Sequence, residues 1–349
     1  MEKPPEPLTM RVDVLVVGQG VSGTFLALAL QKVGLSCLVI DDGRPGSPSR
    51  VAAGLINPVT GKRSVTTWLA AELLPCAREA YGDAYLTERA IVSFFSTLET
   101  RAAFLDRFEE DPTYLRLPRD PHAWAPYFHD HYGHGLIQPA YVADLRGFLS
   151  AARASLPVLE ETFSEDHLAV EPRAVRYKDL EAAHLIFCDG LESMHRCWFE
   201  LLPFSPSKGE ALLIEAPGLP PGPVFKKALT LVPLGESLYW AGSSYEWSYT
   251  DPYPSPAFRT RTEQTLKEWL QVPFRVVDHL ASVRPTTVEQ KPFVGLHPVH
   301  TSIGILGGMG TKGCSLAPYF AQQLAGLLAH GTPILPAADV RRFARILSR

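Results

Sequence analysis

The sequence predicts an α/β fold built around a parallel sheet, with a second part rich in antiparallel strands. Three observations support this. The apolar run Val12–Val17 leads into a glycine-rich turn and then a helical pattern. A second apolar segment, Ser302–Leu306, leads into another glycine-rich turn and another helix. Between these two ends lie several strand-like runs bounded by Pro and Gly.

The N-terminal stretch "DVLVVGQGVSGTFLALAL" forms the first half of a strand–turn–helix–strand unit. The run before the glycines is rich in β-branched residues, which is typical of a buried parallel strand. From Ser22 onward the apolar residues recur at helical spacing, and Gly34 ends this helix. A second strand, Leu35–Ile40, then ends at the acidic pair Asp41 and Asp42. The residues predicted to share the buried helical face are Leu26, Ala29, Leu30 and Val33.

Each glycine of this turn has a physical role in a dinucleotide site. Gly18 permits a tight turn, Gly20 lets the backbone approach a pyrophosphate, and Gly23 lets the helix pack closely on the strand. The helix N-terminus then faces the phosphates, and Asp41 accepts hydrogen bonds from a ribose. The alternative is a plain glycine-rich turn, but the flanking strand, helix and acid favour a dinucleotide.

The second glycine turn, "GGMGTKG", contains Gly308, Gly310 and Gly313. Its helix runs to about His330, and no further strand with an acid follows. We therefore expect this turn to aim a helix N-terminus at another part of the same cofactor. A large ligand touched by both ends of the chain indicates an extended FAD.

Three stretches resemble the D-amino-acid oxidase and glycine oxidase family of FAD-dependent oxidoreductases. The first is the N-terminal turn with Asp41, and the second is the small-residue loop "SRVAAGLINP", Ser49–Pro58. The third is "VRPTTVEQKPFVG" followed by "GGMGTKGCSLAP". The resemblance implies a Rossmann-like FAD-binding domain interleaved with an antiparallel-sheet substrate domain.

The expected domain boundaries follow from this resemblance. The FAD-binding domain would comprise residues 10–82, 136–205 and 279–349. The substrate domain would comprise 83–135, mostly helical, and 206–278, mostly antiparallel sheet. Independent patterns agree in part, because "EALLIEA", "ALTLVPL" and "SLYWAGSSYEW" look like strands and "LETRAAFLDRFEE" has helical spacing. "HLIFCDG" looks like the strand that closes the middle segment of the FAD domain.

The expected cofactor is non-covalently bound FAD. Cys314 is the cysteine nearest the predicted flavin site, and we expect it to point into the core. The predicted cofactor-binding residues are Gly18, Gly20, Val21, Ser22, Gly23, Asp41, Asp42, Arg50, Ala53, Gly54, Leu55, Phe163, Gly308, Gly310, Thr311, Lys312 and Gly313.

The resemblance implies oxidation of a carbon–nitrogen bond by hydride transfer to flavin N5. Such chemistry needs a clamp on the substrate and positive charge beside the flavin. Arg284 is the candidate clamp, because its planar guanidinium can hold a carboxylate through two parallel bonds. Lys312 and the following helix N-terminus are the candidates for the positive charge. The structural alternatives are a surface arginine before a proline turn and a solvated loop lysine.

Two departures from glycine oxidases bear on the substrate. This chain has Thr230 where those enzymes carry a tyrosine, and Thr311 where they carry an arginine. Glycine is therefore not the expected substrate. Thr230 and Tyr245 are candidate substrate-binding residues beside Arg284, although core packing is the commoner fate of a strand aromatic such as Tyr245 or Trp247.

Composition excludes several other classes of protein. The formal net charge is −4, and the only basic cluster is the tail "RRFARILSR", which predicts an amphipathic helix; nucleic acid is therefore not an expected partner. No apolar run reaches the roughly 18 residues of a membrane span. The N-terminus "MEKPPEPLTM" lacks the apolar core of a signal peptide, so we expect a cytoplasmic protein. Five cysteines without a CxxC pair, and a histidine-rich stretch His122–His134 without helical ligand spacing, predict no metal site.

Alternatives to a soluble amine or amino-acid oxidase remain open. One is an oxidase of a modified nucleoside or tRNA, and another is a flavin-binding protein without turnover. A third is a dehydrogenase that passes electrons to a quinone or carrier. For the leading interpretation, an amine or amino-acid oxidase, the expected partner is a small-molecule substrate, with neither nucleic acid nor membrane. The sequence does not indicate the oligomeric state.

Overall fold

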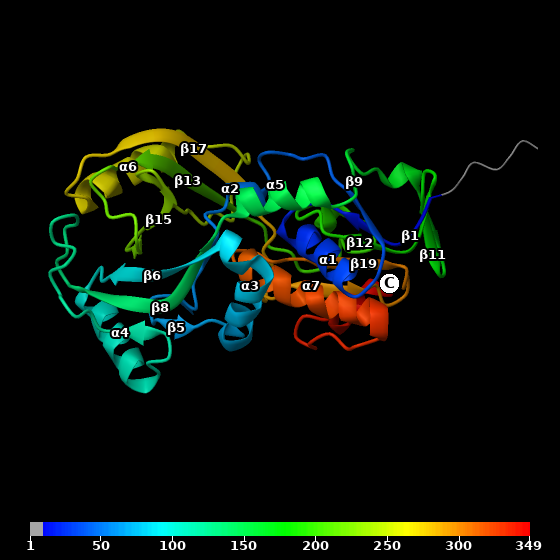
Figure 1. The fold of residues 1–349 in the computed structure, drawn as a ribbon, viewed down its shortest axis with the longest axis horizontal. Coiled ribbons are helices and arrows are strands. Elements are labelled where there is room, and N and C mark those ends of the chain that lie inside the picture. Colours follow the sequence, from blue (N-terminus) through cyan, green and yellow to red (C-terminus); the bar gives the residue numbers. More distant parts are fainter. Residues whose placement is uncertain (1–9) are drawn as a thin grey trace, which may run out of the picture. The chain divides into compact units, whose positions relative to one another are not determined.

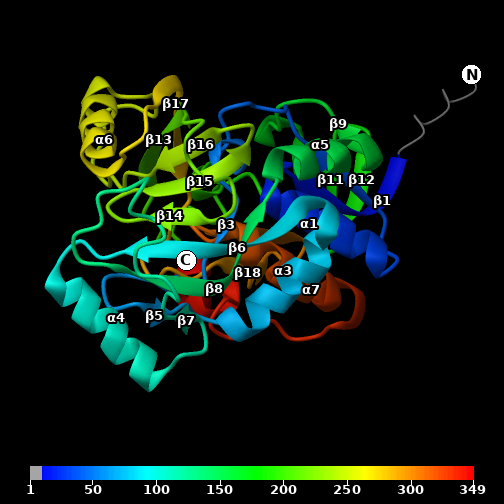
Figure 2. The ribbon, with the colours of Figure 1, turned by 60° about the vertical axis from the view of Figure 1, so that its left-hand side comes forward.

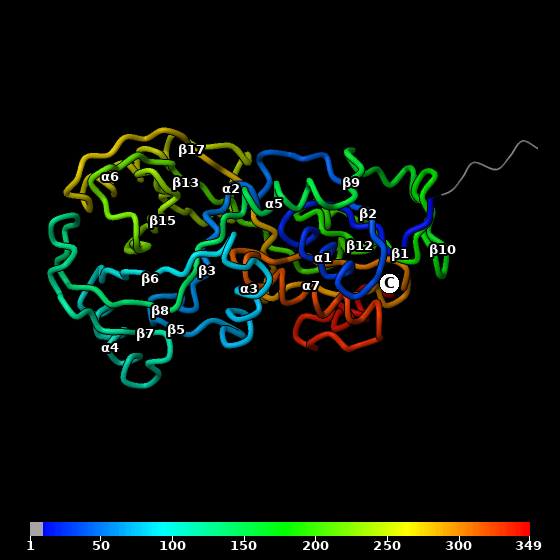
Figure 3. The backbone as a smooth tube through the Cα atoms, viewed as in Figure 1, coloured from blue at the N-terminus to red at the C-terminus, as the bar shows by residue number. Residues whose placement is uncertain are grey.

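The computed structural model describes residues 10–349, which fall into two compact units built from segments far apart in the sequence (Figures 1 and 3). The first unit contains the chain up to Arg50, with Arg146–Pro206 and Arg284–Arg349. The second contains Val51–Leu145 and Ser207–Val283. The sequence "MEKPPEPLTM", from which we expected no signal peptide, lies outside the described residues except for Met10.

The first unit is built on an eight-stranded sheet with a parallel centre. Strands run in the order β9-β2-β1-β12-β19, all parallel, and β18 adds antiparallel to β19, while β11 and β10 continue antiparallel from β12. The strands are β1 (Met10–Val17), β2 (Cys37–Ile40), β9 (Val158–Leu159), β10 (Leu168–Glu171), β11 (Ala174–Tyr177), β12 (Leu180–Phe187), β18 (Phe293–Leu296) and β19 (Ile303–Gly307).

The helices of this unit begin directly after the strands or cover the sheet. α1 follows β1, α7 follows β19, and the two helices lie side by side (Figure 1). The helices are α1 (Val21–Lys32), α2 (Pro48–Val51), α5 (Leu145–Ser155), α7 (Gly313–His330) and α8 (Ala344–Leu347), with 3-10 turns at Glu165–His167, Glu192–His195 and Val340–Phe343. Both predicted glycine-turn units are therefore present, and "HLIFCDG" is indeed a central strand, β12.

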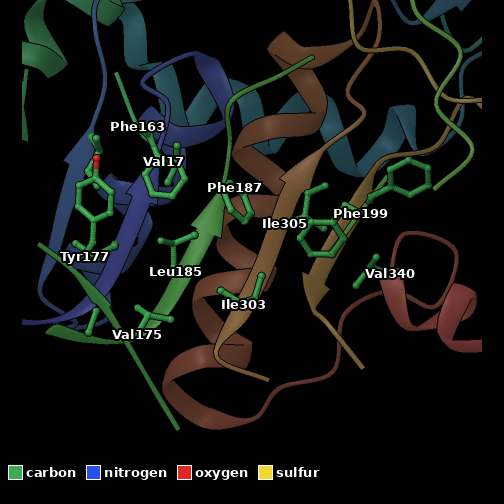
Figure 4. Packing of buried hydrophobic residues seen from close by; sticks show 14 of the residues in the cluster. Val17, Phe163, Val175, Tyr177, Leu185, Phe187, Phe199, Ile303, Ile305 and Val340 are labelled. Atoms are coloured by element: carbon green, nitrogen blue, oxygen red, sulfur yellow. The ribbon is translucent and has the colours of Figure 1, made fainter. Parts of the chain in front are cut away.

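The core of the first unit lies on the face of the sheet shown in Figure 4. Large side chains from alternate positions of β12 and β19 meet there, and Leu185, Phe187 and Ile305 are fully buried. Phe163 belongs to this cluster and stacks on Tyr177 with ring centroids 4.9 Å apart. Val340 and Leu347 of the C-terminal tail also pack into it. The single amphipathic helix expected for the tail is thus a 3-10 turn followed by one helical turn, because Asp339 caps the N–H of Arg341 and starts a new element there.

The second unit is a nine-stranded mixed sheet with three helices (Figure 2). The strand order is β17-β13-β16-β15-β14-β6-β8-β3, with β7 also paired to β8. The elements are β3 (Leu55–Ile56), α3 (Ala70–Tyr85), β6 (Leu86–Phe94), α4 (Leu98–Glu110), β7 (Leu115–Arg116), β8 (His134–Ala143), β13 (Ser207–Glu215), β14 (Val224–Lys226), β15 (Thr230–Gly235), β16 (Leu238–Gly242), α6 (Pro256–Trp269) and β17 (Arg275–Arg284), beside a hairpin of β4 (Val59–Thr60) and β5 (Val65–Thr66).

This unit differs in extent from the expected substrate domain. Residues 51–82, 136–145 and 279–283, expected in the FAD domain, belong to the second unit. The reason is strand pairing, since β3 adds to β8 and β8 pairs along its length with β6. Residues 83–135, expected to be mostly helical, contribute both β6 and α4. The helical stretch "LETRAAFLDRFEE" is α4, which starts at a capping box formed by Thr97 and Thr100.

Among the helices of residues 10–349, none combines the length and the apolar character that a membrane crossing requires.

Candidate functional site

The first glycine turn is constrained by the protein at two of its three glycines. Gly18 has a φ of +96°, and a Cβ there would lie 2.8 Å from the carbonyl oxygen of Cys188. A Cβ at Gly23 would lie 1.8 Å from the carbonyl oxygen of Gly18, so only glycine lets α1 approach β1 this closely. These are the two roles predicted for the first and third glycines.

Gly20 is different, because the protein itself does not require it. Its φ is −77°, which any residue adopts, and a Cβ there would meet only the Ser49 side chain, with Oγ at 3.1 Å. A glycine without a reason inside the protein is expected where a ligand approaches the backbone. This position fits the close approach of a pyrophosphate.

The N-terminus of α1 offers backbone N–H groups to which an anion can bind. Gly20 is the N-cap and supplies no side-chain cap, and the first turn, which contains Val21, Ser22 and Gly23, has no acidic residue. The N–H of Val21 donates to Ser49 Oγ at 3.0 Å. The remaining N–H groups and the helix dipole favour negative charge at this end.

The carboxyl ends of the parallel strands gather the predicted cofactor residues at one edge of the sheet. Gly18 follows β1, Asp41 follows β2 and Gly308 follows β19. In open α/β sheets, ligands bind outside this edge. The loop after β12 lies there too, since Asp189 Cα would be 2.9 Å from a Cβ at Gly18.

Asp41 links the loops at this edge of the sheet, because its carboxylate accepts hydrogen bonds from three donors of the protein. Its Oδ2 accepts from the N–H of Gln19 at 2.7 Å, and its Oδ1 accepts from the N–H of Gly43 and from Arg153 Nη1, both at 2.8 Å. Arg153 Nη1 also donates to Gln19 Oε1 at 2.7 Å. Because a carboxylate has about four acceptor sites, Asp41 keeps room for about one further donor such as a ribose hydroxyl.

Asp42 points to different partners. Its Oδ2 accepts from Thr162 Oγ1 at 3.0 Å and from Arg44 Nε at 2.7 Å. Burial favours the protonated form of this carboxyl, but the hydrogen bonds from Thr162 and Arg44 outweigh burial and lower its pKa. Asp42 is thus held in an ion pair beside the edge.

The second glycine turn packs against the segment that follows Arg284. The N–H of Gly310 donates to the carbonyl of Pro285 at 3.1 Å, and a Cβ at Gly308 would lie 2.6 Å from Thr287 Cγ2. Two motifs that lie apart in the sequence therefore form one structure. Arg284 itself, half-buried, is the last residue of β17.

The two helix N-termini meet at the same place. A Cβ at Gly313, the first residue of α7, would lie 3.3 Å from Cγ1 of Val21, the first residue of α1 (Figure 1). Both helices start without a side-chain cap. Two uncapped helix starts side by side fit a long ligand with more than one electron-rich group.

Lys312 is the N-cap residue of α7, next to the exposed Thr311. Burial lowers the pKa of its ammonium group, and in residues 10–349 no acidic side chain pairs with it. A desolvated lysine without a counter-charge at the start of a helix adds positive charge where α7 already presents the positive end of its dipole.

The remaining predicted residues lie in other surroundings. Arg50 is in α2, and its carbonyl accepts from Arg146 Nε at 3.2 Å. Phe163 lies in the core of the first unit. The others belong to the second unit: Ala53, Gly54 and Leu55 lead into β3, Thr230 begins β15, and Tyr245, which is 54% exposed and stacks on Trp247, follows β16. Gly54 packs on β8, since a Cβ there would lie 1.9 Å from the Ala143 carbonyl oxygen.

Sequence reasoning missed three residues at the carboxyl edge. Ser49 Oγ accepts a hydrogen bond from the N–H of Val21 at the start of α1, and Arg153 of α5 donates to Asp41. Asp189, whose side chain is 9% exposed, lies beside the first glycine turn and accepts from Arg196 Nε at 3.0 Å. Asp189 carries a local signal, because it lies near the end of the predicted strand "HLIFCDG".

The histidine-rich stretch shows a local hydrogen-bond contact instead of a ligand cluster. His134 Nδ1 and Asp130 Oδ2 are 3.0 Å apart, and the rings of His129 and His131 stack. In the part of the chain that the structure describes, no three His, Cys, Asp or Glu side chains are grouped so as to hold a metal ion.

Comparisons with known proteins agree with this geometry. The chain matches the model of the FAD dependent oxidoreductase family (DAO) over residues 13–327. Iminodiacetate oxidase from Chelativorans sp. BNC1 is similar in structure, with a TM-score of 0.76 and 18% identity over 93% of this chain and 99% of that one. Glycine oxidase from Geobacillus kaustophilus has a TM-score of 0.74 and 18% identity, covering 96% and 98%. L-amino acid deaminase from Proteus vulgaris, with a specific insertion deleted, has a TM-score of 0.76 and 15% identity, covering 98% and 97%.

These structures share the fold, and the glycine turns, the uncapped helix starts and Asp41 fit the cofactor that the family name states. The prediction of an FAD-binding α/β fold of the D-amino-acid oxidase type is confirmed. The chain belongs to the FAD dependent oxidoreductase (DAO) family and is an FAD-dependent oxidoreductase.

Proposed function

We propose that this enzyme oxidises the carbon–nitrogen bond of a small amine or amino acid. The observation that carries the proposal is the packing of the Arg284–Thr287 segment on the second glycine turn, through the Gly310 N–H and the Pro285 carbonyl. This contact fixes the predicted substrate clamp to the turn that starts α7. The same turn contains Lys312. The second glycine turn therefore holds both the proposed substrate-binding group, Arg284, and the proposed positive charge, Lys312.

The chemistry divides between the cofactor and the chain. FAD, when bound, supplies at N5 the acceptor for a hydride from the carbon next to nitrogen. The substrate nitrogen loses a proton, and water hydrolyses the resulting imine to a carbonyl compound and an amine. Arg284 holds a substrate carboxylate through its planar fork. Lys312 and the α7 N-terminus stabilise negative charge that develops beside them.

The names of the similar structures support this choice of bond. They are, by their titles, an iminodiacetate oxidase, a glycine oxidase and an L-amino acid deaminase. Each name states a substrate that contains a carbon–nitrogen bond next to a carboxylate. With identities of 18% or less, this likeness leaves the individual substrate to experiment.

The test is a spectrum of the purified protein, followed by anaerobic titration with amino acids and N-methyl amines. We expect a yellow protein whose visible absorbance bleaches with at least one compound of the panel. When both proteins are loaded with FAD, Lys312→Met should bleach more slowly than the wild type. If the wild-type protein binds FAD and no amine of the panel bleaches it, the proposed oxidation is wrong.

A further inference from the structure

Asp189 lies directly beside the first glycine turn of the first unit. β12 pairs with β1 up to Val17 and Phe187, and the N–H of Cys188 then donates to the Val17 carbonyl at 2.8 Å. A Cβ at Gly18 would lie 2.9 Å from Cα of Asp189. The loop that begins at Asp189 therefore packs on the turn that leads into α1, and the N-terminus of α1 is the predicted position of the FAD pyrophosphate.

The carboxylate of Asp189 is held by its own loop. Its Oδ2 accepts hydrogen bonds from Arg196 Nε at 3.0 Å and from Arg196 Nη2 at 2.9 Å, and its Oδ1 accepts one from Ser193 Oγ. A carboxylate has about four acceptor sites, so most of the capacity of Asp189 is used within the loop. Arg196 supplies the cation for this largely buried carboxylate.

Arg196 is held in turn by two aromatic rings and a second carboxylate. Its guanidinium carbon lies 5.1 Å from the ring centroid of Phe163 and 5.3 Å from that of Phe187, two rings of the core shown in Figure 4. Its Nη1 donates to Oε1 of Glu165 at 3.0 Å. Burial opposes the charge of Arg196, but Asp189 and Glu165 outweigh burial and raise the pKa of the guanidinium. A charged side chain with a fixed orientation therefore lies against Asp189.

A carboxylate at this place would disfavour an anionic ligand if it had no cation beside it. Burial raises the pKa of Asp189, whereas Arg196 and Ser193 act to lower it and so favour the charged form. An unpaired negative charge beside a turn that receives a pyrophosphate adds electrostatic repulsion. Glu165, the other partner of Arg196, has a side chain that is 35% exposed, so water screens its charge. The ion pair thus keeps the hydrogen bonds of Asp189 and cancels its charge.

The same arrangement occurs on the other side of the turn. Asp41, which follows β2, accepts a hydrogen bond from Arg153 Nη1 at 2.8 Å. β2 and β12 are the two neighbours of β1 in the sheet. An acid at the end of each neighbouring strand is therefore paired with an arginine. A buried ion pair is often no more stabilising than apolar residues of similar volume, so fold stability alone does not account for Asp189 and Arg196.

We propose that Arg196 neutralises Asp189 and thereby lets the pyrophosphate of FAD bind over the first glycine turn. Arg196 acts on the cofactor through Asp189, so it is a positioning residue. The inference goes beyond the proposed function, because it concerns how the chain receives its cofactor and does not depend on the substrate.

The test measures FAD binding to the apoprotein without substrate. FAD is titrated into each apoprotein, and the quenching of flavin fluorescence gives the dissociation constant. Arg196→Met leaves Asp189 without its cation, and the dissociation constant should rise about tenfold or more. Asp189→Asn removes the negative charge itself and should bind FAD within about threefold of the wild type. The double variant, Arg196→Met with Asp189→Asn, should also bind within about threefold of the wild type, because the second change removes the charge that the first leaves unpaired.

The double variant separates this role from packing. If Arg196 acted only by packing, the double variant would bind FAD as weakly as Arg196→Met. Arg173→Met, at an exposed position of the same unit, removes one positive charge elsewhere and should leave the affinity unchanged. Melting temperatures of the apoproteins identify a folding defect. If Arg196→Met does not fold, the test rests on Asp189→Asn and the double variant, because neither contains the unpaired charge.

Wild-type affinity in folded Arg196→Met overturns the inference. So does a double variant as weak as Arg196→Met, or a loss of tenfold or more in Asp189→Asn. No amine is present in this titration, so its result is separate from the anaerobic bleaching that tests the proposed function. If FAD binding follows the expected pattern but no amine bleaches the flavin, the role of Arg196 stands and the proposed oxidation fails. If amines bleach the flavin and Arg196→Met binds FAD normally, the oxidation stands and the role of Arg196 fails.

Discussion

The backbone N–H of Gln19 donates to Oδ2 of Asp41 across 2.7 Å, which ties the first glycine turn to the end of the neighbouring strand. Arg153 completes this link, because its Nη1 donates to both Asp41 Oδ1 and Gln19 Oε1. The acid expected to hold a ribose thus also orders the turn expected to hold a pyrophosphate. Arg153, which is far from both motifs in the sequence, therefore helps to position both of them.

Arg153→Met should weaken FAD binding. The variant removes three hydrogen bonds to Asp41 and Gln19, and the loss of a charged partner costs about 1–3 kcal/mol. The dissociation constant of FAD, measured by fluorescence on the apoprotein, should rise accordingly. Arg101→Met, at an exposed position of α4, is the control and should leave it unchanged. Equal affinity in both variants would show that Asp41 holds its position without Arg153.

Gly20→Ala and Gly23→Ala should separate ligand binding from folding. At Gly20 the added Cβ meets only a serine side chain, so the apoprotein should melt near the wild-type temperature while FAD binding is lost. At Gly23 the added Cβ would overlap the Gly18 carbonyl, and we expect destabilisation of about 3 kcal/mol or more. Melting curves and FAD content of both variants are the measurement. Normal FAD content in Gly20→Ala would show that the pyrophosphate does not approach the backbone at Gly20.

The elements that the sequence predicted well are those with local signals. β1, α1 and α7 were expected from apolar periodicity and from glycines whose positive φ or close packing the structure now shows. Ser49 and Arg153 could not be found in this way. Their roles depend on long-range contacts, 28 residues from Val21 and 112 residues from Asp41. Arg153 lies in no distinctive pattern, and the stretch that begins at Ser49 does not reveal the contact of Ser49 with α1.

The same limit explains why the boundaries of the two units were not predicted. Two-residue β3 carries no periodicity of its own, yet its pairing with β8 draws the segment after Arg50 into the second unit.

FAD should be released completely by acid precipitation. A covalent link needs a reactive side chain, and Cys314, the candidate in the first turn of α7, is only 9% exposed. Yellow colour in the supernatant and a colourless pellet are expected. Flavin that stays with the pellet, and is lost from it in Cys314→Ser, would show that this cysteine is linked to the ring.

The protein should lose stability as the pH falls from about 6.5 towards 4, in part through His297. Burial and the nearby His300 lower the pKa of His297 to about 4, and its Nδ1 accepts the N–H groups of Val299 and His300. The folded state therefore favours the neutral ring. Its contribution is fully present above the unfolded pKa of 6.5 and is lost as the pH falls through the folded value.

A His297→Asn variant tests this assignment. Asparagine accepts a hydrogen bond and does not titrate, so the variant should show a smaller difference between its melting temperatures at pH 7 and pH 4.5. The wild-type contribution is about 2–3 kcal/mol across that range. His122→Asn, at an exposed position, serves as the control. An acid-induced loss in His297→Asn as large as in the wild type would assign the effect to other groups.

Arg284 decides between a substrate with a carboxylate and a plain amine. If it clamps a carboxylate, Arg284→Ala should lower kcat/KM on the best substrate by the equivalent of about 2–5 kcal/mol. Arg284→Lys should recover little, because a point charge cannot reproduce the two parallel bonds of the fork. FAD content should be normal in both variants, since the predicted pyrophosphate and ribose contacts come from α1 and Asp41.

The competing role of Arg284 is structural. Arg284 precedes Pro285, and its carbonyl accepts from the Thr286 N–H at 2.8 Å. In that case the alanine variant would melt earlier while kcat/KM barely changed, and a carboxylate-free amine would become the better substrate class.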